Sequence, residues 1–322
     1  MIVDGVETRM RLTVLGGFLG SGKTTWLRHQ LHHGRFRDAH VVVNEAAETP
    51  VDDVLLGKSS ALTVLAGGCA CCEGRADLIA ALRKLCDERS RTFSSESRLQ
   101  RIVLETSGLA DPGAIVEAIR ADAMLIHHIV VSEIIVAVDG LNGLSQLASE
   151  PLGRRQAEIA DRLVVTKLDA ADPETIARLA ATLKHLNPGA AIGGAINGSD
   201  VPPPDGTGVE PADLPDLSGE RAAPIFATRL ALDETVDWTA FGVWLSALLH
   251  ARGDQVMRVK GVVRTPAGRL LLQSVRKIVQ SPEILPGQDD DASREDDTIV
   301  VIGRGYRAED LRRSLNYFAG LR

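Results

Sequence analysis

The stretch Gly17-Phe18-Leu19-Gly20-Ser21-Gly22-Lys23-Thr24 decides the fold of this chain of 322 residues. It matches the pattern G-x-x-x-x-G-K-[ST] in full, directly after an apolar run at residues 12–15 and directly before a segment expected to be helical. Glycines let such a loop wrap closely, so that backbone N–H groups point at phosphate oxygens, and the following helix adds its positive end. The sequence therefore predicts a phosphate-binding loop rather than a chance glycine-rich turn.

Side chains of this loop and of a later strand are expected to hold a nucleoside triphosphate. Lys23 would bridge the β- and γ-phosphates, and Thr24 would ligate Mg²⁺. Glu105 follows the apolar run 102–104, where its carboxylate can reach Mg²⁺ directly or through water; the alternative is a solvent-facing strand end. Gly108 allows a backbone N–H to sense the γ-phosphate. The residues predicted to bind the nucleotide here are Gly17, Gly20, Ser21, Gly22, Lys23, Thr24, Thr25 and Gly108.

The choice of base is predicted by Thr166-Lys167-Leu168-Asp169, which follows another apolar run. The Asp169 carboxylate can accept two hydrogen bonds from the N1–H and 2-amino groups of guanine, which adenine does not offer. The stem of Lys167 can lie along the base. The usual form of this motif begins with Asn, and Thr166 is a variant of it. We therefore expect GTP rather than ATP, bound in part by Lys167 and Asp169.

Short apolar runs alternate with helical segments over the first 200 residues. The runs lie at 12–15, 40–43, 101–104, 134–138 and 162–165, and they are apolar almost throughout, as is typical of strands buried on both faces of a parallel sheet. A helix is predicted after Asp172-Pro173, where apolar residues recur at helical spacing. This alternation predicts an α/β fold of the P-loop NTPase kind, a mostly parallel sheet with helices on both faces.

The chain changes character after residue 196. Residues 197–223 are rich in proline and glycine and have no periodicity, which favours a linker or a surface excursion. Strands are predicted beyond it at 225–230, 256–264, 269–279 and 298–302, with helices at 238–251 and 308–318. We therefore predict a P-loop GTPase domain over residues 1–200, a proline-rich linker over 201–223 and a smaller α+β domain over 224–322.

Composition excludes several classes of protein. A formal net charge of −7 argues against a nucleic-acid binder that works through a general positive field. Nothing approaches 18 uninterrupted apolar residues, so no membrane span is expected, and the N-terminus lacks the apolar core of a secretory signal. Four cysteines are too few for a disulfide scaffold. We expect a cytoplasmic protein without a nucleic-acid or membrane partner.

Three of the four cysteines fall within Gly67-Gly68-Cys69-Ala70-Cys71-Cys72. Thiolates at this spacing can converge on one soft cation, and zinc prefers thiolate-rich tetrahedral sites. A fourth ligand could be a carboxylate, a water or a residue of a target protein. The alternatives are small core residues or a redox pair. Cys86 shares a helical face with Leu78, Ile79 and Leu82, which predicts a packed core residue.

Together these motifs resemble the CobW-type GTPases, relatives of the UreG and HypB metal-insertion proteins. The resemblance rests on the loop from Gly17 to Thr25, on Asn44-Glu45, on Gly68-Cys69-Ala70-Cys71-Cys72 and on Glu105-Thr106-Ser107-Gly108-Leu109-Ala110-Asp111-Pro112. The C-terminal part, from residues 258–261 through 301–303, is similar to the second domain of that family. The resemblance covers most of the chain, and the combination of a P-loop with C-x-C-C is highly specific.

The resemblance implies a GTP-hydrolysing metallochaperone that holds Zn²⁺, or a similar divalent ion such as Co²⁺, and passes it to a client metalloprotein in a GTP-dependent way. Cys69, Cys71 and Cys72 would hold the metal, with Glu48 as a further ligand. Glu45 and Glu48 are candidates to orient the attacking water. We expect a monomer or a weak homo-oligomer. The residues expected to act in hydrolysis are Lys23, Thr24, Glu45 and Glu105.

The chain departs from the family in two places. The first switch usually reads Asn-Glu-Phe-Gly-Glu, whereas Asn44-Glu45-Ala46-Ala47-Glu48 keeps both glutamates and loses the aromatic residue and the glycine. Many members carry a histidine-rich stretch before the second domain, and the linker here holds no histidine. The pairs His32-His33 and His127-His128 are interpreted as surface or structural residues, because neighbouring side chains point to different sides.

Other functions stay open on the sequence alone. A P-loop kinase or ATP-using transferase with a redox thiol loop would prefer ATP, and Asp169 argues against it. A nucleotide-switch scaffold would recruit a partner through the C-terminal domain without transferring metal. The cargo could instead be cobalt for cobalamin synthesis, or iron or cobalt for nitrile hydratase activation, although thiolate ligands favour zinc.

Overall fold

The computed structural model forms two compact units, which we describe separately. The larger unit comprises residues 9–186 and 190–221, and the smaller comprises residues 1–8, 187–189 and 222–322. The structure describes all residues except 1, 4–5, 8, 46–60, 67–73, 93–97, 216–224, 233–236, 254, 266–267, 276–277, 280–281, 285–296 and 321–322. The domain boundaries given above stay predictions.

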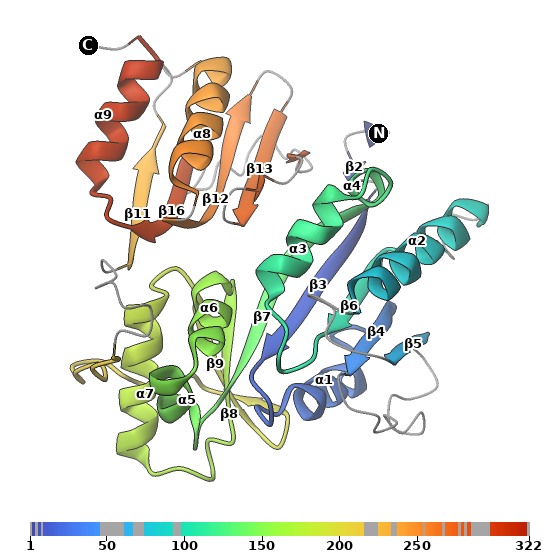
Figure 1. Ribbon diagram of the computed structural model, residues 1–322, viewed down its shortest axis with the longest axis vertical. Helices are drawn as coiled ribbons and strands as arrows, with labels where there is room; N and C mark the ends of the chain where they lie inside the picture. The colour runs from blue at the N-terminus through green and yellow to red at the C-terminus, as the bar shows by residue number, and fades with distance from the viewer. Residues whose placement is uncertain are drawn as a thin grey trace. The chain divides into compact units, whose positions relative to one another are not determined.

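The larger unit is built on an eight-stranded sheet with the strand order β10-β9-β8-β7-β3-β6-β4-β5 (Figure 1). Strand β3 (Met10–Gly17) lies inside it and pairs in parallel with β6 and β7. Every pairing in this sheet is parallel except that of β9 with β10. This confirms the predicted α/β class. The other strands are β4 (Ala39–Glu45), β5 (Leu62–Ala66), β6 (Arg101–Glu105), β7 (Ile129–Asp139), β8 (Arg162–Thr166), β9 (Ala191–Ile196) and β10 (Ser199–Val201).

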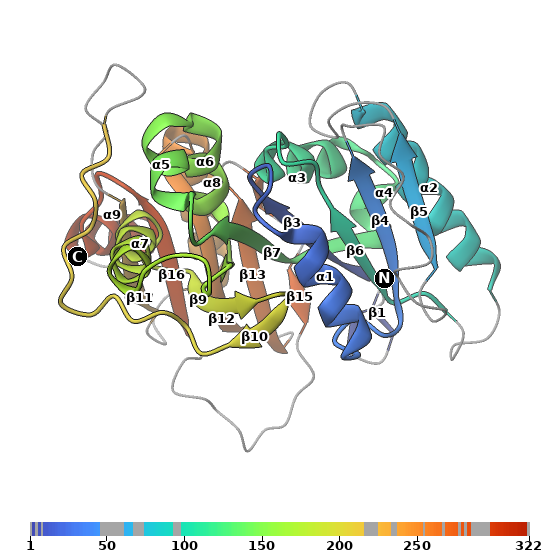
Figure 2. The ribbon, with the colours of Figure 1, turned by 90° about the horizontal axis from the view of Figure 1, so that it is seen from below.

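Helices cover both faces of this sheet, because alternate strand residues point to opposite sides. Leu15 packs with Trp26 and Leu27 of α1 in one apolar cluster, whereas a Cβ on the next residue, Gly16, would touch Pro112 of α3. Figure 2 shows the two layers of helices. The helices of this unit are α1 (Lys23–His32), α2 (Arg75–Arg91), α3 (Pro112–Ala121), α4 (Leu125–His128), α5 (Gly143–Ser149), α6 (Pro151–Ile159) and α7 (Pro173–Leu186).

The segment interpreted as a linker or surface excursion begins with regular structure. Asn197 and Gly198 turn the chain with positive φ angles of 50° and 87°, and β10 then pairs antiparallel with β9. The chain next runs along α7, where Ala212 N donates to Thr182 Oγ1 (2.9 Å) and Gly206 lies close to Ala181 N. This hairpin was not predicted, because two glycines interrupt the apolar pattern of β9 and β10 has only three residues.

The smaller unit holds a six-stranded antiparallel sheet with the order β11-β16-β12-β13-β14 and with β15 paired to β13. Leu230, Val259 and Ile299 of the sheet form one apolar core with Phe241 and Trp244 of α8. The predicted α+β character is confirmed, and the strand expected over 269–279 is divided into β13 and β14. The elements are β11 (Ile225–Ala231), α8 (Trp238–Arg252), β12 (Val256–Thr265), β13 (Gly268–Val275), β14 (Ile278–Val279), β15 (Glu283–Ile284), β16 (Thr298–Arg304) and α9 (Ala308–Phe318), with a hairpin of β1 (Ile2–Val3) and β2 (Val6–Glu7).

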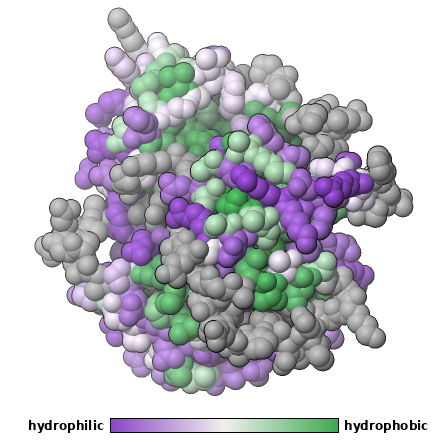
Figure 3. Space-filling view, turned by 45° about the vertical axis from the view of Figure 1, so that its right-hand side comes forward, coloured by the Kyte–Doolittle hydropathy of each residue, from purple (hydrophilic) through white to green (hydrophobic). Residues whose placement is uncertain are grey.

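The surface in Figure 3 mixes polar side chains with separate apolar patches. Among the described residues, no helix is both long enough and apolar enough to span a bilayer. Where side chains are described, the large apolar ones that are exposed are Leu19, Val64, Leu109, Leu141, Val243, Tyr317 and Phe318.

Candidate functional site

The predicted phosphate-binding loop joins β3 to α1, and its glycines adopt conformations that other residues rarely reach. Gly17, Gly20 and Gly22 have φ angles of 137°, 74° and 78°. A Cβ on Gly17 would lie 2.4 Å from the carbonyl oxygen of Ala137, so no side chain fits there. The same Cβ would lie 2.8 Å from Ser21 Oγ. The loop therefore wraps tightly over the end of β7.

Two polar groups of the loop, the Lys23 ammonium and the Ser21 hydroxyl, face inward. Lys23 is 8% exposed, and its Nζ donates to the carbonyl oxygens of Gly17 and Phe18, each at 3.0 Å. The Ser21 hydroxyl is fully buried and has no hydrogen-bond partner within the described part of the chain. An unpaired buried hydroxyl is costly, and phosphate oxygens would satisfy it. The donor chemistry of the loop thus fits a polyphosphate.

The residues expected to hold Mg²⁺ lie in direct contact. Thr24 Oγ1, in the first turn of α1, donates a short hydrogen bond to Glu105 Oε1. Glu105 is only 3% exposed and ends β6, whose parallel register with β3 sets it opposite Leu15. A hydroxyl beside a carboxylate is the hard oxygen donor set that Mg²⁺ prefers. This pair therefore fits the ion that accompanies a nucleoside triphosphate.

The segment after β6 packs against the tip of the loop. A Cβ on Gly108 would lie 2.6 Å from both Leu19 Cα and Leu19 N, so the two backbones touch. Gln156 of α6 is buried, and its Nε2 donates to the carbonyl oxygens of Ala110 (2.7 Å) and Gly108 (3.4 Å). Gln156 was not predicted as a site residue, since a single glutamine in a helix carries no motif.

The end of β8 is tied to the same loop through the residue that replaces the usual asparagine. Thr166 Oγ1 donates to the carbonyl oxygen of Ser21 (2.8 Å) and lies 3.2 Å from that of Val138. Gly140 N donates in turn to the Thr166 carbonyl oxygen (2.8 Å). The hydroxyl of Thr166 thus connects the phosphate-binding loop with the segment expected to recognise the base.

Lys167 and Asp169, which follow Thr166, lie in different environments. Lys167 has a positive φ of 54°, and its Nζ pairs with Asp139 Oδ2 at 2.8 Å, whereas Asp169 is exposed. Burial raises the pKa of Asp139, but Lys167, the Asn142 side chain and two backbone N–H groups outweigh burial, so the pKa lies below its ordinary value. Asp139 stays ionised and fixes the Lys167 ammonium. Asp139 was not predicted as a site residue, although an acidic residue directly after an apolar run is a visible signal in the sequence.

The proposed metal ligands fall outside this description. Cys69, Cys71, Cys72 and Glu48 are not among the described residues, and Glu45 is described only by its backbone at the end of β4. The described residues contain no group of three or more His, Cys, Asp or Glu side chains placed to hold a metal.

Cys86 of α2 is fully buried, as predicted for a core residue. Burial raises the pKa of its thiol to about 11. Such a thiol is neither a ready nucleophile nor a ready metal ligand, because both roles need the thiolate. Cys86 is therefore a packing residue, in contrast to the role expected of the cysteine cluster.

Two domain families match the sequence. Residues 11–193 match the CobW/HypB/UreG nucleotide-binding domain. The chain belongs to this family. Residues 226–319 also match the C-terminal domain of the cobalamin synthesis protein CobW, so both parts of the resemblance to CobW-type GTPases are confirmed.

Relatives of this CobW-type chain carry names that describe metal handling. The protein named zinc chaperone YjiA of Escherichia coli is 29% identical over 324 residues, which covers 97% of this chain and 98% of the relative. The zinc chaperone CobW of Pseudomonas aeruginosa is 27% identical over 313 residues, which covers 84% of this chain and 81% of that relative. The crystal structure of Zn(II)-bound YjiA GTPase from E. coli superimposes with a TM-score of 0.60 at 23% identity, over 98% of this chain and 100% of that one. That superposition shows a shared fold.

Proposed function

We propose that this protein is a GTP-hydrolysing metallochaperone that binds Zn²⁺ at Cys69, Cys71 and Cys72 and transfers it to a client metalloprotein. The observation that carries the nucleotide part is the contact between Thr24 and Glu105 beside a loop whose buried Lys23 and Ser21 face inward. The metal part rests on the cysteine cluster and on relatives that are named zinc chaperones.

Each residue of the site makes a different contact with the nucleotide. Lys23 exchanges the carbonyl oxygens of Gly17 and Phe18 for β- and γ-phosphate oxygens, and Ser21 gains an acceptor. Thr24 and Glu105 would hold Mg²⁺, which when bound supplies neutralisation of charge on the phosphate oxygens. The backbone of Gly108, held by Gln156, lies against the loop tip where a γ-phosphate contact is expected. Gly17, Gly20, Gly22 and Thr25 complete the loop.

Base selection falls to Asp169, with Lys167 fixed by Asp139 beside it. Asp169 is exposed, so its carboxylate is accessible to an incoming base, and guanine offers it two hydrogen-bond donors. Glu45 and Glu48 are our candidates for orienting the attacking water. Thr166 supports this arrangement because its hydroxyl connects the base-recognition segment to Ser21 of the loop.

The metal is the cargo, and the nucleotide state controls its release. The Cys69–Cys72 segment and Glu48 lie in the sequence between two segments that contact the nucleotide, so loss of the γ-phosphate would change the metal geometry. Thiolates favour Zn²⁺, and Co²⁺ is the second cargo to test. We place the protein in the cytoplasm, where reducing conditions keep the three thiols available, as a monomer or weak homo-oligomer with no nucleic-acid or membrane partner.

The decisive experiment measures metal release as a function of nucleotide. Zinc-loaded protein is mixed with a chromogenic chelator in the presence of Mg²⁺ and GTP, a non-hydrolysable GTP analogue or ATP. We expect faster zinc release with GTP than with either of the others, together with release of inorganic phosphate. Equal rates with ATP would contradict the base assignment, and equal rates with the analogue would favour a switch that works without hydrolysis.

A second arm tests the metal ligands. The double variant Cys71→Ala, Cys72→Ala is expected to lose the tight zinc site while keeping its affinity for GTP, because the nucleotide contacts lie on other segments. The matched control is Thr92→Ala, a half-buried position at the C-terminal end of α2 whose hydroxyl donates to the Glu88 carbonyl oxygen. If the double variant still bound one Zn²⁺ with native affinity, the cysteine assignment would be wrong.

A further inference from the structure

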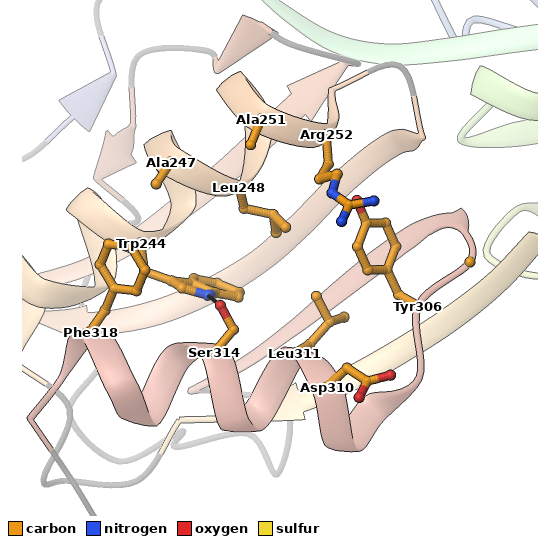
Figure 4. Close-up of a pocket in the computed structure, with 11 residues that line it drawn as sticks. Trp244, Ala247, Leu248, Ala251, Arg252, Tyr306, Asp310, Leu311, Ser314 and Phe318 are labelled. Carbon is orange, nitrogen blue, oxygen red and sulfur yellow. Dashed lines mark hydrogen bonds between the residues drawn. The ribbon is translucent and has the colours of Figure 1, made fainter.

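A cavity of about 450 Å³ opens between α8 and α9 in the smaller unit. We call it the α8–α9 groove; its walls are set by Trp244, Leu248 and Arg252 on α8 and by Asp310, Leu311 and Phe318 on α9 (Figure 4). This volume lies within the range of protein binding sites. None of these residues belongs to the nucleotide site or to the cysteine cluster.

One end of the groove is apolar and firmly built. Trp244 and Leu311 are buried in the core of the unit, and Trp244 Nε1 donates to Ser314 Oγ at 3.1 Å. Phe318 stands at the edge with 40% of its surface exposed, and its ring packs edge-on against that of Tyr317, which is 83% exposed. A rigid aromatic wall beside exposed aromatic rings is the typical composition of a protein docking site.

The other end of the groove carries two donors that converge on a single oxygen. Arg252 Nη1 and Tyr306 Oη both donate to Gln255 Oε1, at 3.2 and 3.4 Å. Burial raises the pKa of Tyr306, against the opposing effect of Arg252, so the hydroxyl stays a donor at neutral pH. Among the described residues, the Arg252 guanidinium pairs with the neutral amide of Gln255 and with no carboxylate. A carboxylate oxygen in that position would gain a charge-assisted hydrogen bond.

Asp310 lines the groove from the first turn of α9. Its negative charge limits the anionic charge that the polar end can accept, which favours one carboxylate over a phosphate or a polyanion. Trp244 and Arg252 are eight residues apart on α8, or about 12 Å along the helix axis. An extended segment spans that length in about four residues.

We propose that the α8–α9 groove docks a segment of a partner protein that presents one large apolar side chain and one carboxylate, about four residues apart. The apolar side chain packs on Phe318, beside the buried Trp244, and the carboxylate pairs with Arg252 and Tyr306. A peptide fits better than a small molecule because Arg252, Asp310 and Phe318 are all exposed, whereas small-molecule sites enclose most of the ligand. This docking is independent of the nucleotide and metal proposals.

The test is selection from a phage-displayed library of random peptides, about twelve residues long, on the full chain, followed by fluorescence anisotropy with a labelled selected peptide. We expect enrichment of a large apolar residue and an Asp or Glu at the stated spacing. Arg252→Gln and Phe318→Ser should each weaken binding at least tenfold, and Asp310→Asn should leave it equal or tighter. The matched controls Arg313→Gln and Leu141→Ser, both at exposed positions outside the groove, should stay within twofold.

Several results would overturn the proposal. The first is the absence of any enrichment above the unselected library. The second is enrichment of basic peptides whose binding depends on Asp310 instead of Arg252. The third is binding that neither Arg252→Gln nor Phe318→Ser weakens. Concentration-dependent self-association abolished by Phe318→Ser would assign the groove to a second copy of the chain. The substituted side chains are exposed, and unchanged thermal unfolding of each variant checks that the fold is kept.

Discussion

Thr24 Oγ1 donates a hydrogen bond to Glu105 Oε1, which joins two residues 81 positions apart in the sequence. The contact exists because β3 and β6 are parallel neighbours, so that the loop after one strand and the end of the other meet at the same sheet edge. The two side chains that we propose as Mg²⁺ ligands are thereby placed together beside the phosphate-binding loop, where each can be removed separately by substitution.

Thr24→Val keeps the shape of the side chain and removes its hydroxyl, so it should weaken binding of GTP only when Mg²⁺ is present. We expect at least a tenfold loss of GTP affinity with Mg²⁺, and less than a twofold change in EDTA, in titrations of a fluorescent GTP analogue. Glu105→Gln should behave in the same way. An equal loss in EDTA would mean that the substitution distorts the loop, against the assignment of these residues to the metal.

Asp169→Asn should change the base preference. The variant loses charge-assisted hydrogen bonds to guanine, worth about 1.5–3 kcal/mol each, so GTP affinity should fall about tenfold or more. The asparagine amide can donate to the 2-oxo group of xanthine, so XTP should bind better than to the native chain. Competition titrations with GTP, XTP and ATP measure both effects. A variant that bound GTP as tightly as the native protein would remove Asp169 from the site.

Asp122 makes stability depend on acid pH. Burial raises its pKa, but hydrogen bonds from Leu125 N, Arg83 and Met124 N outweigh burial and leave the pKa below its ordinary value. Because the folded pKa is depressed, this contribution is present above the unfolded pKa of about 3.9 and disappears as the pH falls through the folded value.

Asp122→Asn should therefore lower the free energy of unfolding by about 1–3 kcal/mol at pH 7, and the deficit should shrink below about pH 4. Urea unfolding followed by circular dichroism between pH 7 and pH 3 measures it. The exposed control Asp38→Asn should stay close to the native protein at every pH. A deficit of the same size at pH 3 would show that packing, not charge, is responsible.

Cys86 should be unreactive in the folded protein. In the variant Cys69→Ser, Cys71→Ser, Cys72→Ser it is the one thiol left, and with a pKa of about 11 little of it is thiolate at pH 8. We expect its reaction with a disulfide reagent to be at least about 100-fold slower in buffer than in denaturing urea. Similar rates in the two conditions would place this thiol at the surface.

Glycine positions give a matched pair of variants. Gly108→Ala would force a Cβ to within 2.6 Å of the Leu19 backbone, so we expect a loss of about 1–3 kcal/mol in stability and at least tenfold in GTP affinity. Gly242 lies inside α8, and a methyl group added there would meet nothing within 4 Å, so Gly242→Ala should stabilise the chain by about 0.5–1 kcal/mol without affecting GTP. Thermal unfolding and nucleotide titration distinguish the two outcomes.

Much of the fold follows from local sequence patterns. The five predicted apolar runs all lie in strands of the larger unit, namely β3, β4, β6, β7 and β8. Helix α7 begins at the predicted Asp172 cap, whose Oδ1 accepts from Thr175 N at 2.9 Å. Such signals depend on neighbours within a few residues, so they survive without tertiary knowledge. The hairpin of β9 and β10 was not predicted, because β9 contains two glycines, β10 has only three residues, and the turn depends on the positive φ angles of Asn197 and Gly198.

The sequence by itself determined the phosphate-binding loop, the class of fold and the presence of both a P-loop and a cysteine cluster, because each of these signals lies within a short run of neighbouring residues. Only the tertiary structure decided that Thr166 bonds to Ser21, that Asp139 fixes Lys167 and that Gln156 holds the backbone of Gly108. These contacts join residues 145, 28 and 48 positions apart. Strand order brings them together, and strand order is set by the packing of the whole sheet rather than by any local pattern.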